Sequence, residues 1–187
     1  FNKENVIKAK EILLKYPTDR RQSAIMPLLD LAQRQNENWL SRDIVEYVAD
    51  YLEMPFIKAW EVVTFYSMYY TKYNGKYLVQ VCGTTPCWLR GSNKITDTIC
   101  KETKCQINET SEDNLFTVVE VECLGACINA PMMQINNDYY EDLDIKQSEK
   151  IIDEVLMGKK PKPGSYRGRI NSEPENNRKT LLDLKNA

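Results

Sequence analysis

The sequence predicts an α+β protein of three parts: a helical bundle over residues 1–73, an α/β domain over residues 74–160 and an extended tail over residues 161–187. Three observations predict this division. Apolar residues recur at helical spacing as far as the Asn74-Gly75 pair. Two segments rich in β-branched and aromatic residues follow that pair, and the end of the chain has few apolar residues.

Four helical segments are expected in the first part of the chain. The first ends before Pro17, and the second runs from about Gln22 to about Asn36. The third begins after Ser41, a favourable N-cap residue, and Pro55 opens the fourth. Their apolar residues are Val6, Ile7, Ile12, Leu13 and Leu14; Ile25, Leu28, Leu29 and Ala32; Ile44, Val45, Val48, Ala49 and Leu52; and Trp60, Val63, Phe65 and Met68. Four such helices would pack as a small bundle.

The segment between Ser41 and Tyr70 also fits the outline of a helix-turn-helix DNA reader, but its second helix argues against that function. From Pro55 it carries Trp, Val, Phe and Tyr where a recognition helix presents Arg, Lys, Asn and Gln. The net charge of −2 favours neither nucleic acid nor an anionic membrane as a partner. We therefore expect no nucleic-acid partner. Because no run of roughly 18–20 apolar residues occurs, we also expect no membrane insertion.

The second part opens with a strand, a helix and another strand. Tyr77–Val81 and Phe116–Val121 are rich in the β-branched and aromatic residues that strands favour. Residues 91–104, between them, have a helical pattern with Ile95 and Ile99 facing inward. A polar loop is expected between this helix and the second strand.

A hairpin and a last helix complete this domain. Met132–Ile135 and Tyr139-Tyr140 form the hairpin around residues 136–138, which are all turn formers. Asp144 caps the last helix, and Gln147 is its capping-box partner. The resulting order, β-α-β-β-α, matches the small three-layer thioredoxin-like arrangement.

The last part of the chain, from Lys159 onward, is dominated by Lys, Pro, Gly, Asn and Arg. A segment of this composition can bury little apolar surface, so it is expected to be extended. Leu181, Leu182 and Leu184 are the residues that could anchor it on another surface.

The chemistry open to this chain is set by six cysteines and the lack of any histidine. Without histidine there is no Ser-His-Asp or Cys-His catalysis, no Cys₂His₂ zinc finger and no Rieske centre. Neither G-x-G-x-x-G nor G-x-x-x-x-G-K-S/T occurs, so no nucleotide-binding loop is visible. No C-x-x-C occurs either, which argues against a thiol oxidoreductase of thioredoxin type.

Spacing divides the cysteines into three close pairs, Cys82/Cys87, Cys100/Cys105 and Cys123/Cys127. A disulfide framework is typical of short secreted chains, whereas this chain has 187 residues. Four thiolates would suit either a structural zinc ion or a 2Fe–2S cluster, and gaps of four residues are familiar in the cluster proteins. Spacing therefore favours the cluster and leaves zinc open.

The expected elements distinguish the pairs. Cys82 and Cys123 each lie at or just after the end of an expected strand and open a loop that contains glycine. Two such loops at neighbouring strand ends can meet over one site, with Cys87 and Cys127 as the second ligand of each loop. Glycines there let backbone N–H groups approach the sulfurs and offset their negative charge.

The remaining pair is assigned no ligand role. Cys100 falls in the expected helix, where a small core-facing thiol is a simpler interpretation than a ligand. Cys105 lies in the polar loop beyond and is expected to be an exposed free thiol. Apolar cover for the other four cysteines is expected from Leu124, Ile128, Pro131 and Met132.

Short runs around these four cysteines resemble the thioredoxin-like 2Fe–2S ferredoxin subunit of respiratory complex I, the NADH:quinone oxidoreductase. The runs are Cys82–Cys87 (CGTTPC), Val121–Cys127 (VECLGAC) and Ala130–Met133 (APMM). Resemblance to the helical N-terminal domain of that subunit is carried by Ser23–Leu29 (SAIMPLL), Trp39–Ser41 (WLS) and Glu61–Met68 (EVVTFYSM). The resemblance covers about residues 1–170.

The resemblance implies that Cys82, Cys87, Cys123 and Cys127 hold one 2Fe–2S cluster that carries single electrons. It implies a neighbouring subunit that binds FMN, oxidises NADH and carries a 4Fe–4S cluster, with further iron–sulfur subunits in the same complex. FMN and NAD then belong to the partner, and this chain needs no substrate site of its own. The complex would place it peripherally, on the cytoplasmic side of a bacterial inner membrane or the matrix side of a mitochondrial one. A low potential, near about −400 mV, is expected for the cluster.

Two other assignments use the same thiolates. The equivalent subunit of an NAD-linked hydrogenase or formate dehydrogenase would share the cluster and the type of partner. A zinc-stabilised binding module would have no redox chemistry, and it would be colourless. The helices of residues 1–73 are interpreted as a docking surface, with simple cover for the sheet as the alternative.

Overall fold

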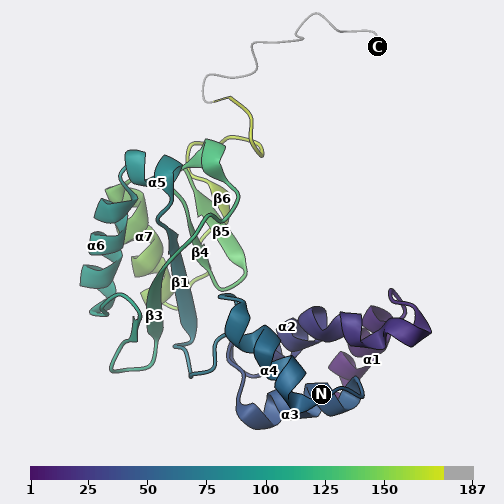
Figure 1. The fold of residues 1–187 in the computed structure, drawn as a ribbon. Helices are drawn as coiled ribbons and strands as arrows, with labels where there is room; N and C mark the ends of the chain where they lie inside the picture. The colour runs from purple at the N-terminus through teal and green to yellow at the C-terminus, as the bar shows by residue number, and fades with distance from the viewer. Residues whose placement is uncertain (175–187) are drawn as a thin grey trace, which may run out of the picture. The chain divides into compact units, whose positions relative to one another are not determined.

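The structure, a computed structural model, describes residues 1–174 (Figure 1). The chain divides into two compact units, Phe1–Asn74 and Gly75–Ala187. The first is built of helices, and the second contains a mixed β-sheet with helices. Across the described residues, every helix is too short or too polar to cross a membrane.

The helices of the first unit are α1 (Lys3–Leu13), the 3-10 helix η1 (Thr18–Ala24), α2 (Ile25–Gln35), α3 (Arg42–Tyr51) and α4 (Phe56–Phe65). The expected start of α3 is confirmed, because the Ser41 hydroxyl accepts a 3.3 Å hydrogen bond from the Ile44 amide. The second helix starts later than expected, since residues 18–24 form η1 with a non-helical backbone at Arg20. α4 ends at Phe65, so the expectation that Met68 belongs to it is wrong.

One apolar cluster holds the helices of the first unit together. Its fully buried side chains include Leu28, Leu29, Leu40, Val45 and Val48. Burying a side chain of this size stabilises the fold by roughly 1.5–3 kcal/mol. The Tyr69 hydroxyl donates a 2.9 Å hydrogen bond to the Met26 carbonyl, which ties the segment after α4 to α2.

The second unit is built on one mixed sheet. Its strands are β1 (Tyr77–Cys82), β2 (Glu109–Thr110), β3 (Phe116–Val121), β4 (Met133–Ile135), β5 (Asp138–Glu141) and β6 (Gly164–Ser165), and their order in the sheet is β2-β3-β1-β4-β5-β6. β1 and β3 are parallel, with Cys82 paired to Val121. β4 and β5 form the expected antiparallel hairpin. The parallel pair needs a crossover connection, which the helix between β1 and β3 supplies.

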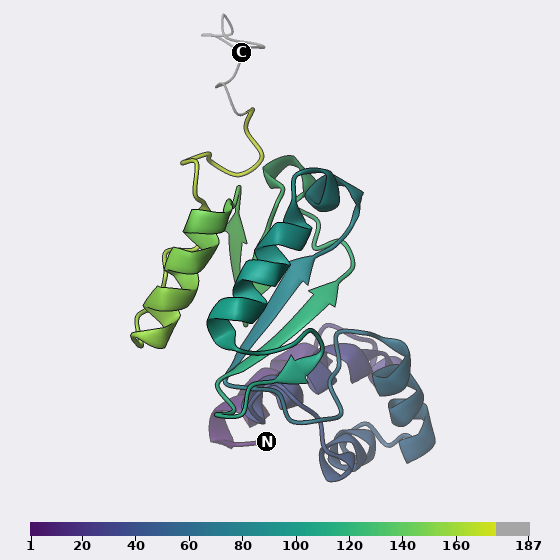
Figure 2. The same ribbon diagram turned by 90° about the vertical axis from the view of Figure 1, so that its left-hand side faces the viewer.

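The helices of this unit are α5 (Thr85–Leu89), α6 (Ser92–Thr103), the 3-10 helix η2 (Cys127–Asn129) and α7 (Ile145–Leu156). α6 and α7 lie side by side on one face of the sheet (Figure 2). Ile95 and Ile99 of α6 face inward as expected, and they share an apolar cluster with Val79 of β1 and Ile151 of α7. Because both long helices cover the same face, the described part of this unit has two layers, not the three expected.

The start of α7 is the capping box that the sequence predicts. The Asp144 carboxylate accepts a 2.8 Å hydrogen bond from the Gln147 amide. The Gln147 side chain in turn accepts one of 2.8 Å from the Asp144 amide. Two backbone N–H groups at the helix start are thereby satisfied.

The described part of the segment from residue 161, which is expected to be an extended tail, packs on the sheet. Pro161 is buried, and Gly164–Ser165 add β6 to the sheet beside β5. Strand β5 offers an open edge of hydrogen-bonding groups, and β6 satisfies it. The expected anchors Leu181, Leu182 and Leu184 lie outside the described residues.

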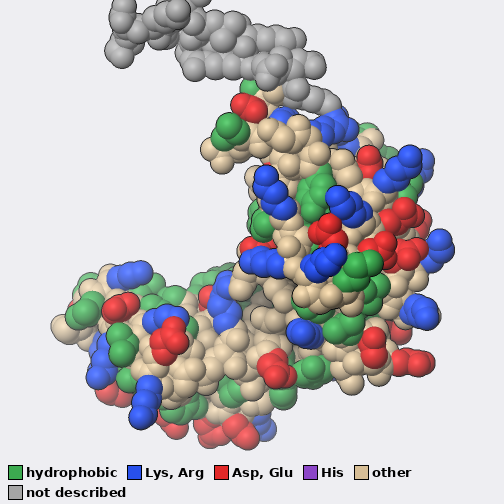
Figure 3. All heavy atoms as spheres, turned by 180° about the vertical axis from the view of Figure 1, so that it is seen from behind, with side chains coloured by type: hydrophobic (Ala, Val, Ile, Leu, Met, Phe, Trp, Pro, Cys, Tyr) green, Lys and Arg blue, Asp and Glu red, His purple; other side chains and the backbone are tan. Residues whose placement is uncertain are grey.

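Charged side chains of both signs are interspersed over the face of the molecule shown in Figure 3. This mixture agrees with the nearly balanced count of acidic and basic residues in the chain, 27 and 25. A single-sign field that would attract nucleic acid is not suggested by this face.

Candidate metal centre

The structure brings four cysteines together at one end of the sheet. Cys82 is the last residue of β1, and Cys123 follows β3 by two residues. Because β1 and β3 are parallel neighbours, the loops that follow them leave the sheet at the same end. Cys87 lies in α5, and Cys127 begins η2. The expected meeting of two strand-end loops is therefore present.

The first pair is buried. Cys82 and Cys87 are each 1% exposed and pack with Ala130 and Met132. The sulfur of Cys82 is hydrogen-bonded to the Thr84 hydroxyl at 3.3 Å. The expected loop after Cys82 is short, because Thr85–Leu89 form the helix α5, with Pro86 early in its first turn.

The second pair is exposed. The sulfurs of Cys123 and Cys127 lie 3.4 Å apart, and the Gly125 amide donates to the Cys123 sulfur at 3.4 Å. Gly125 has a φ of +82°, a conformation that side chains disfavour, whereas the space around it is open. Backbone conformation, not close approach, is thus the reason for glycine here. The Tyr139 hydroxyl steadies the same loop with a 2.9 Å hydrogen bond to the Leu124 carbonyl.

Burial is the largest single influence on the two buried thiols, and by itself it acts to raise the pKa. At Cys87 it acts together with the adjacent Cys82 thiol, and the pKa rises to about 12. At Cys82, hydrogen bonds from the Thr84 hydroxyl and from the Leu124 and Thr84 amides outweigh burial, so the pKa is lowered. Cys82 is therefore the member of this pair that more readily holds negative charge.

In the exposed pair, as in the buried pair, the pKa of the first cysteine is lowered and that of the second is raised. The Gly125 amide is the largest influence on Cys123 and, with the Cys127 thiol, lowers its pKa. The hydrogen bond with Cys123 is the largest influence on Cys127 and raises its pKa. Each loop thus places a polar donor at the first of its two sulfurs.

This donor set fits a 2Fe–2S cluster. Such a cluster takes four thiolates, two on each iron, and N–H groups near the sulfurs tune it. The two loops supply two pairs of thiols, with donors at Cys82 and Cys123. Within residues 1–174, no three Cys, Asp or Glu side chains converge on a point where a single metal ion would sit.

The apolar cover differs in part from what the sequence predicts. Leu124 and Met132 pack with the buried cysteines, and Pro131 is buried, as expected. Ile128 is exposed, so the expectation that it shields the site is wrong. Thr84 and Tyr139, which hold the two loops, were not singled out in the sequence. The sequence offers a clue to Thr84, because this residue directly precedes the Thr85-Pro86 start of α5. It offers none to Tyr139, because this residue belongs to the hairpin and is distant in the chain from the loop that it contacts.

The other two cysteines lie elsewhere. Cys100 is half-buried and packs against the core beneath α6, as expected. The expectation that Cys105 is exposed is wrong: it is 4% exposed, and its thiol donates to the Glu109 carbonyl at 2.9 Å. The polar loop folds over it because Glu109–Thr110 pair with β3 as strand β2. Its contact with the Phe116 carbonyl places it at the opposite end of β3 from Cys123.

Comparison with known proteins gives a consistent result. Residues 9–156 match the family described as thioredoxin-like 2Fe-2S ferredoxin. An NADH-quinone oxidoreductase subunit of Rickettsia felis is 56% identical over 154 residues, which are 82% of this chain and 92% of that protein. The mitochondrial NADH dehydrogenase (ubiquinone) flavoprotein 2 of Dictyostelium discoideum is 46% identical over 183 residues, which are 98% of this chain and 74% of that protein.

Among solved structures, an NAD⁺-reducing NiFe-hydrogenase in the air-oxidized state has a similar fold. Its TM-score is 0.61 at 18% sequence identity. The similarity covers 70% of this chain but only 23% of the hydrogenase chain. At this identity the likeness concerns the fold alone.

Proposed function

Since the chain belongs to the thioredoxin-like 2Fe–2S ferredoxin family, we propose that it is a one-electron carrier subunit of an NADH:quinone oxidoreductase, with a 2Fe–2S cluster on Cys82, Cys87, Cys123 and Cys127. The observation that carries this proposal is the meeting of two cysteine pairs, from the loops after two parallel strands, at one end of the sheet. Relatives that are 46% and 56% identical are named as subunits of that complex or as its flavoprotein 2.

Anaerobic purification of the full chain tests the cluster directly. About two irons and two acid-labile sulfides per chain, with a reddish-brown colour, are expected. Stoichiometric zinc in a colourless protein would mean that the chain is the zinc-stabilised module instead.

A 2Fe–2S cluster, when bound, accepts and releases one electron at a time. The residues of this chain stabilise the negative charge on the sulfurs, since the Thr84 hydroxyl and the Gly125 amide donate to them. The buried pair, Cys82 and Cys87, lies away from water, whereas Cys123 and Cys127 are exposed. Electrons would therefore enter and leave on the side of the exposed pair.

The side chains beside the site suggest a protein neighbour. Trp88, Leu89 and Ile128 are all more than half exposed, and each lies one or two residues from a cysteine of the site. Large apolar side chains in water around a site mark a contact surface. We assign this surface to an NADH-oxidising subunit that binds FMN and a 4Fe–4S cluster, with further iron–sulfur subunits in the complex. The chain would then lie peripherally, on the cytoplasmic or the matrix side of the membrane.

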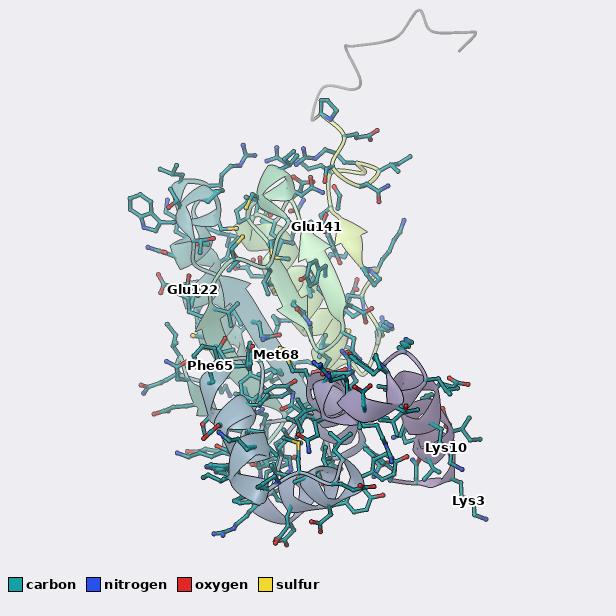
Figure 4. All side chains as sticks on the ribbon, turned by 45° about the vertical axis from the view of Figure 1, so that its right-hand side comes forward. Lys3, Lys10, Phe65, Met68, Glu122 and Glu141 are labelled. Carbon is teal, nitrogen blue, oxygen red and sulfur yellow. The ribbon has the colours of Figure 1, made fainter. Side chains whose placement is uncertain are left out.

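Helices α1–α4 are proposed to form a docking bundle. The C-terminal end of α4 leaves Phe65 exposed to 80% and Met68 exposed just beyond it (Figure 4). A cavity of about 530 Å³, open to solvent, is lined there by residues of α4 and by Tyr66. An apolar end with a neighbouring hollow suits an aromatic or aliphatic anchor from a partner.

Charge at the end of α4 should weaken partner binding. The double substitution Phe65→Asp, Met68→Asp is expected to reduce the affinity for the flavoprotein by at least about tenfold, as loss of an interface anchor does. Affinity is measured by titrating one purified subunit with the other. The matched control is Leu14→Asp, since Leu14 is 85% exposed on the same unit and lies after α1. Equal affinities of the two variants would show that the end of α4 does not contact the flavoprotein.

The hydroxyl of Thr84 should raise the reduction potential of the cluster. Thr84→Val removes the hydrogen bond to Cys82 with little change in shape, so the more negative reduced state loses more stabilisation than the oxidised state. From a wild-type value near about −400 mV, a decrease of about 40 mV is expected for a differential loss of about 1 kcal/mol. Thr84→Ser keeps the hydroxyl and should keep the potential. A redox titration that gives the same value for all three proteins would contradict the assignment.

A second assignment would use the same cluster and the same type of partner. The chain would then be the equivalent subunit of an NAD-linked hydrogenase or a formate dehydrogenase. Identification of the proteins that co-purify with the intact chain separates the two, because the cluster and the flavoprotein partner are shared and only the remaining subunits differ.

A further inference from the structure

The segment after α7 folds back over the sheet as a strap, defined here as residues 164–173. Its first two residues form β6 against β5. The Tyr166 amide then donates a 3.0 Å hydrogen bond to the Glu141 carbonyl. The strap is thereby fixed along the edge strand before it reaches the loop that contains Cys127.

Arg169 is the centre of the strap's polar contacts. Its side chain is 7% exposed, and it forms a two-pronged ion pair with Asp142, whose side chain is 0% exposed. One contact joins Arg169 Nε to Asp142 Oδ2 at 2.9 Å, and the other joins Nη2 to Oδ1. The Ser165 hydroxyl donates to the same carboxylate at 2.6 Å. Arg169 is thus locked in one orientation by a buried anion.

The same guanidinium reaches the candidate metal centre. Arg169 Nη2 donates a 2.9 Å hydrogen bond to the carbonyl of Ile128, the residue that follows Cys127. The next residue, Asn129, is held on two sides. Its side-chain nitrogen Nδ2 donates hydrogen bonds to Glu141 Oε2 at 2.5 Å and to the Asn171 carbonyl at 2.8 Å. Figure 4 shows Glu141 on the sheet at that end of the unit.

Support for this loop matters because its two cysteines lie at the surface. Cys123 and Cys127 are exposed, and exposed loops open locally at low cost in free energy. Asn129 is tied back to the sheet through its carbonyl, which accepts a 2.7 Å hydrogen bond from the Asp142 amide. Asp142 therefore anchors the loop through its backbone and, by way of Arg169, through its side chain. A metal site must hold its ligands within about 0.5 Å, so partners behind the ligands matter.

We propose that Arg169 is a positioning residue for Cys127. By joining the Ile128 carbonyl to the buried Asp142 carboxylate, it holds the exposed ligand loop closed over the cluster. This inference rests on the proposed function, because the loop has a ligand to position only if the cluster is bound.

The experiment compares the full chain, purified anaerobically with its cluster, with three variants. Arg169→Met removes the positive charge and the hydrogen bonds to Asp142 and to the Ile128 carbonyl. Arg169→Lys keeps a cation for Asp142 but lacks the planar fork that serves Asp142 and Ile128 together. Val155→Ala, in the buried face of α7, is the control that destabilises the same unit at a residue outside the strap. The rate of cluster loss to an iron chelator is followed by visible absorption, and visible circular dichroism reports the cluster environment.

Arg169→Met is expected to lose its cluster about tenfold faster than the wild type, as variants of residues behind metal ligands do. Arg169→Lys should lie between the two, with an altered dichroism spectrum, whereas Val155→Ala should keep the wild-type spectrum. If Arg169→Met and Arg169→Lys both match the wild type in rate and spectrum, the positioning role is overturned while the cluster assignment stands. A wild-type chain that takes up no iron and sulfide overturns both.

Discussion

Alanine in place of Cys82, Cys87, Cys123 or Cys127 is expected to abolish the cluster, with iron and sulfide per chain falling by more than about tenfold. Four thiolates complete the coordination of the two irons, and a methyl group cannot replace one. Alanine is chosen because a serine oxygen can itself bind iron. Iron and acid-labile sulfide are measured on anaerobically purified protein, together with the visible spectrum.

The chain supplies its own controls. Cys100→Ala and Cys105→Ala remove thiols of the same unit that lie away from the four, since Cys105 bonds to carbonyls at the other end of β3. Both variants should keep the full content of iron and sulfide. Retention of a normal cluster after replacement of Cys87 or Cys123 would contradict the ligand assignment. Loss of the cluster in Cys105→Ala would contradict it as well.

Asn in place of Asp142 is expected to lower the free energy of unfolding of the second unit by about 3–5 kcal/mol. The substitution keeps the shape but leaves the Arg169 guanidinium buried without its counter-charge. Hydrogen exchange of the β1 amides measures this unit alone, because these amides lie in the centre of its sheet. The control is Asp138→Asn on β5, which removes an exposed ion pair with Lys160 and should cost about 0–1 kcal/mol.

The pH dependence of this penalty follows from the pKa of Asp142. Burial raises that pKa, but hydrogen bonds from Arg169 and Ser165 outweigh burial and lower it below the ordinary value of 3.8. A carboxylate whose pKa falls on folding contributes its full stability above the unfolded value and loses it as the pH falls through the folded value. The difference between wild type and Asp142→Asn should therefore be the same at about pH 7 and about pH 5. A difference that shrinks between these two values would show that the pKa is not lowered.

Much of the fold has local signals that can be read from the chain. Ser41 and the Asp144–Gln147 pair satisfy the first amides of their helices with their own side chains, so these starts follow from a few neighbouring residues. The strands Tyr77–Cys82 and Phe116–Val121 can also be predicted from their own residues, because β-branched and aromatic side chains favour strands. Cys82 and Cys123 stand at their ends, so the juxtaposition of the two cysteine loops could be predicted as well.

The errors concern contacts between distant residues. Cys105 lies in a polar segment and reads as exposed, yet β2 pairs with β3 and buries it. Residues 161–174 read as an extended tail, yet β6 completes the sheet edge. The composition of a short segment reports how much apolar surface it can bury by itself, but not the edge or the counter-charge that another segment offers.

The sequence by itself determined the order of the main elements, the family, and which cysteines could meet, because each depends on residues that are close in the chain or carry a specific motif. Only the tertiary structure decided which thiols are buried, which sulfurs receive hydrogen bonds from Thr84 and Gly125, and that Arg169 binds an aspartate 27 residues earlier. The physical reason is that burial and charge pairing depend on the whole packed chain. Local propensity acts over a few residues, whereas a buried ion pair exists only after the surrounding segments have excluded water.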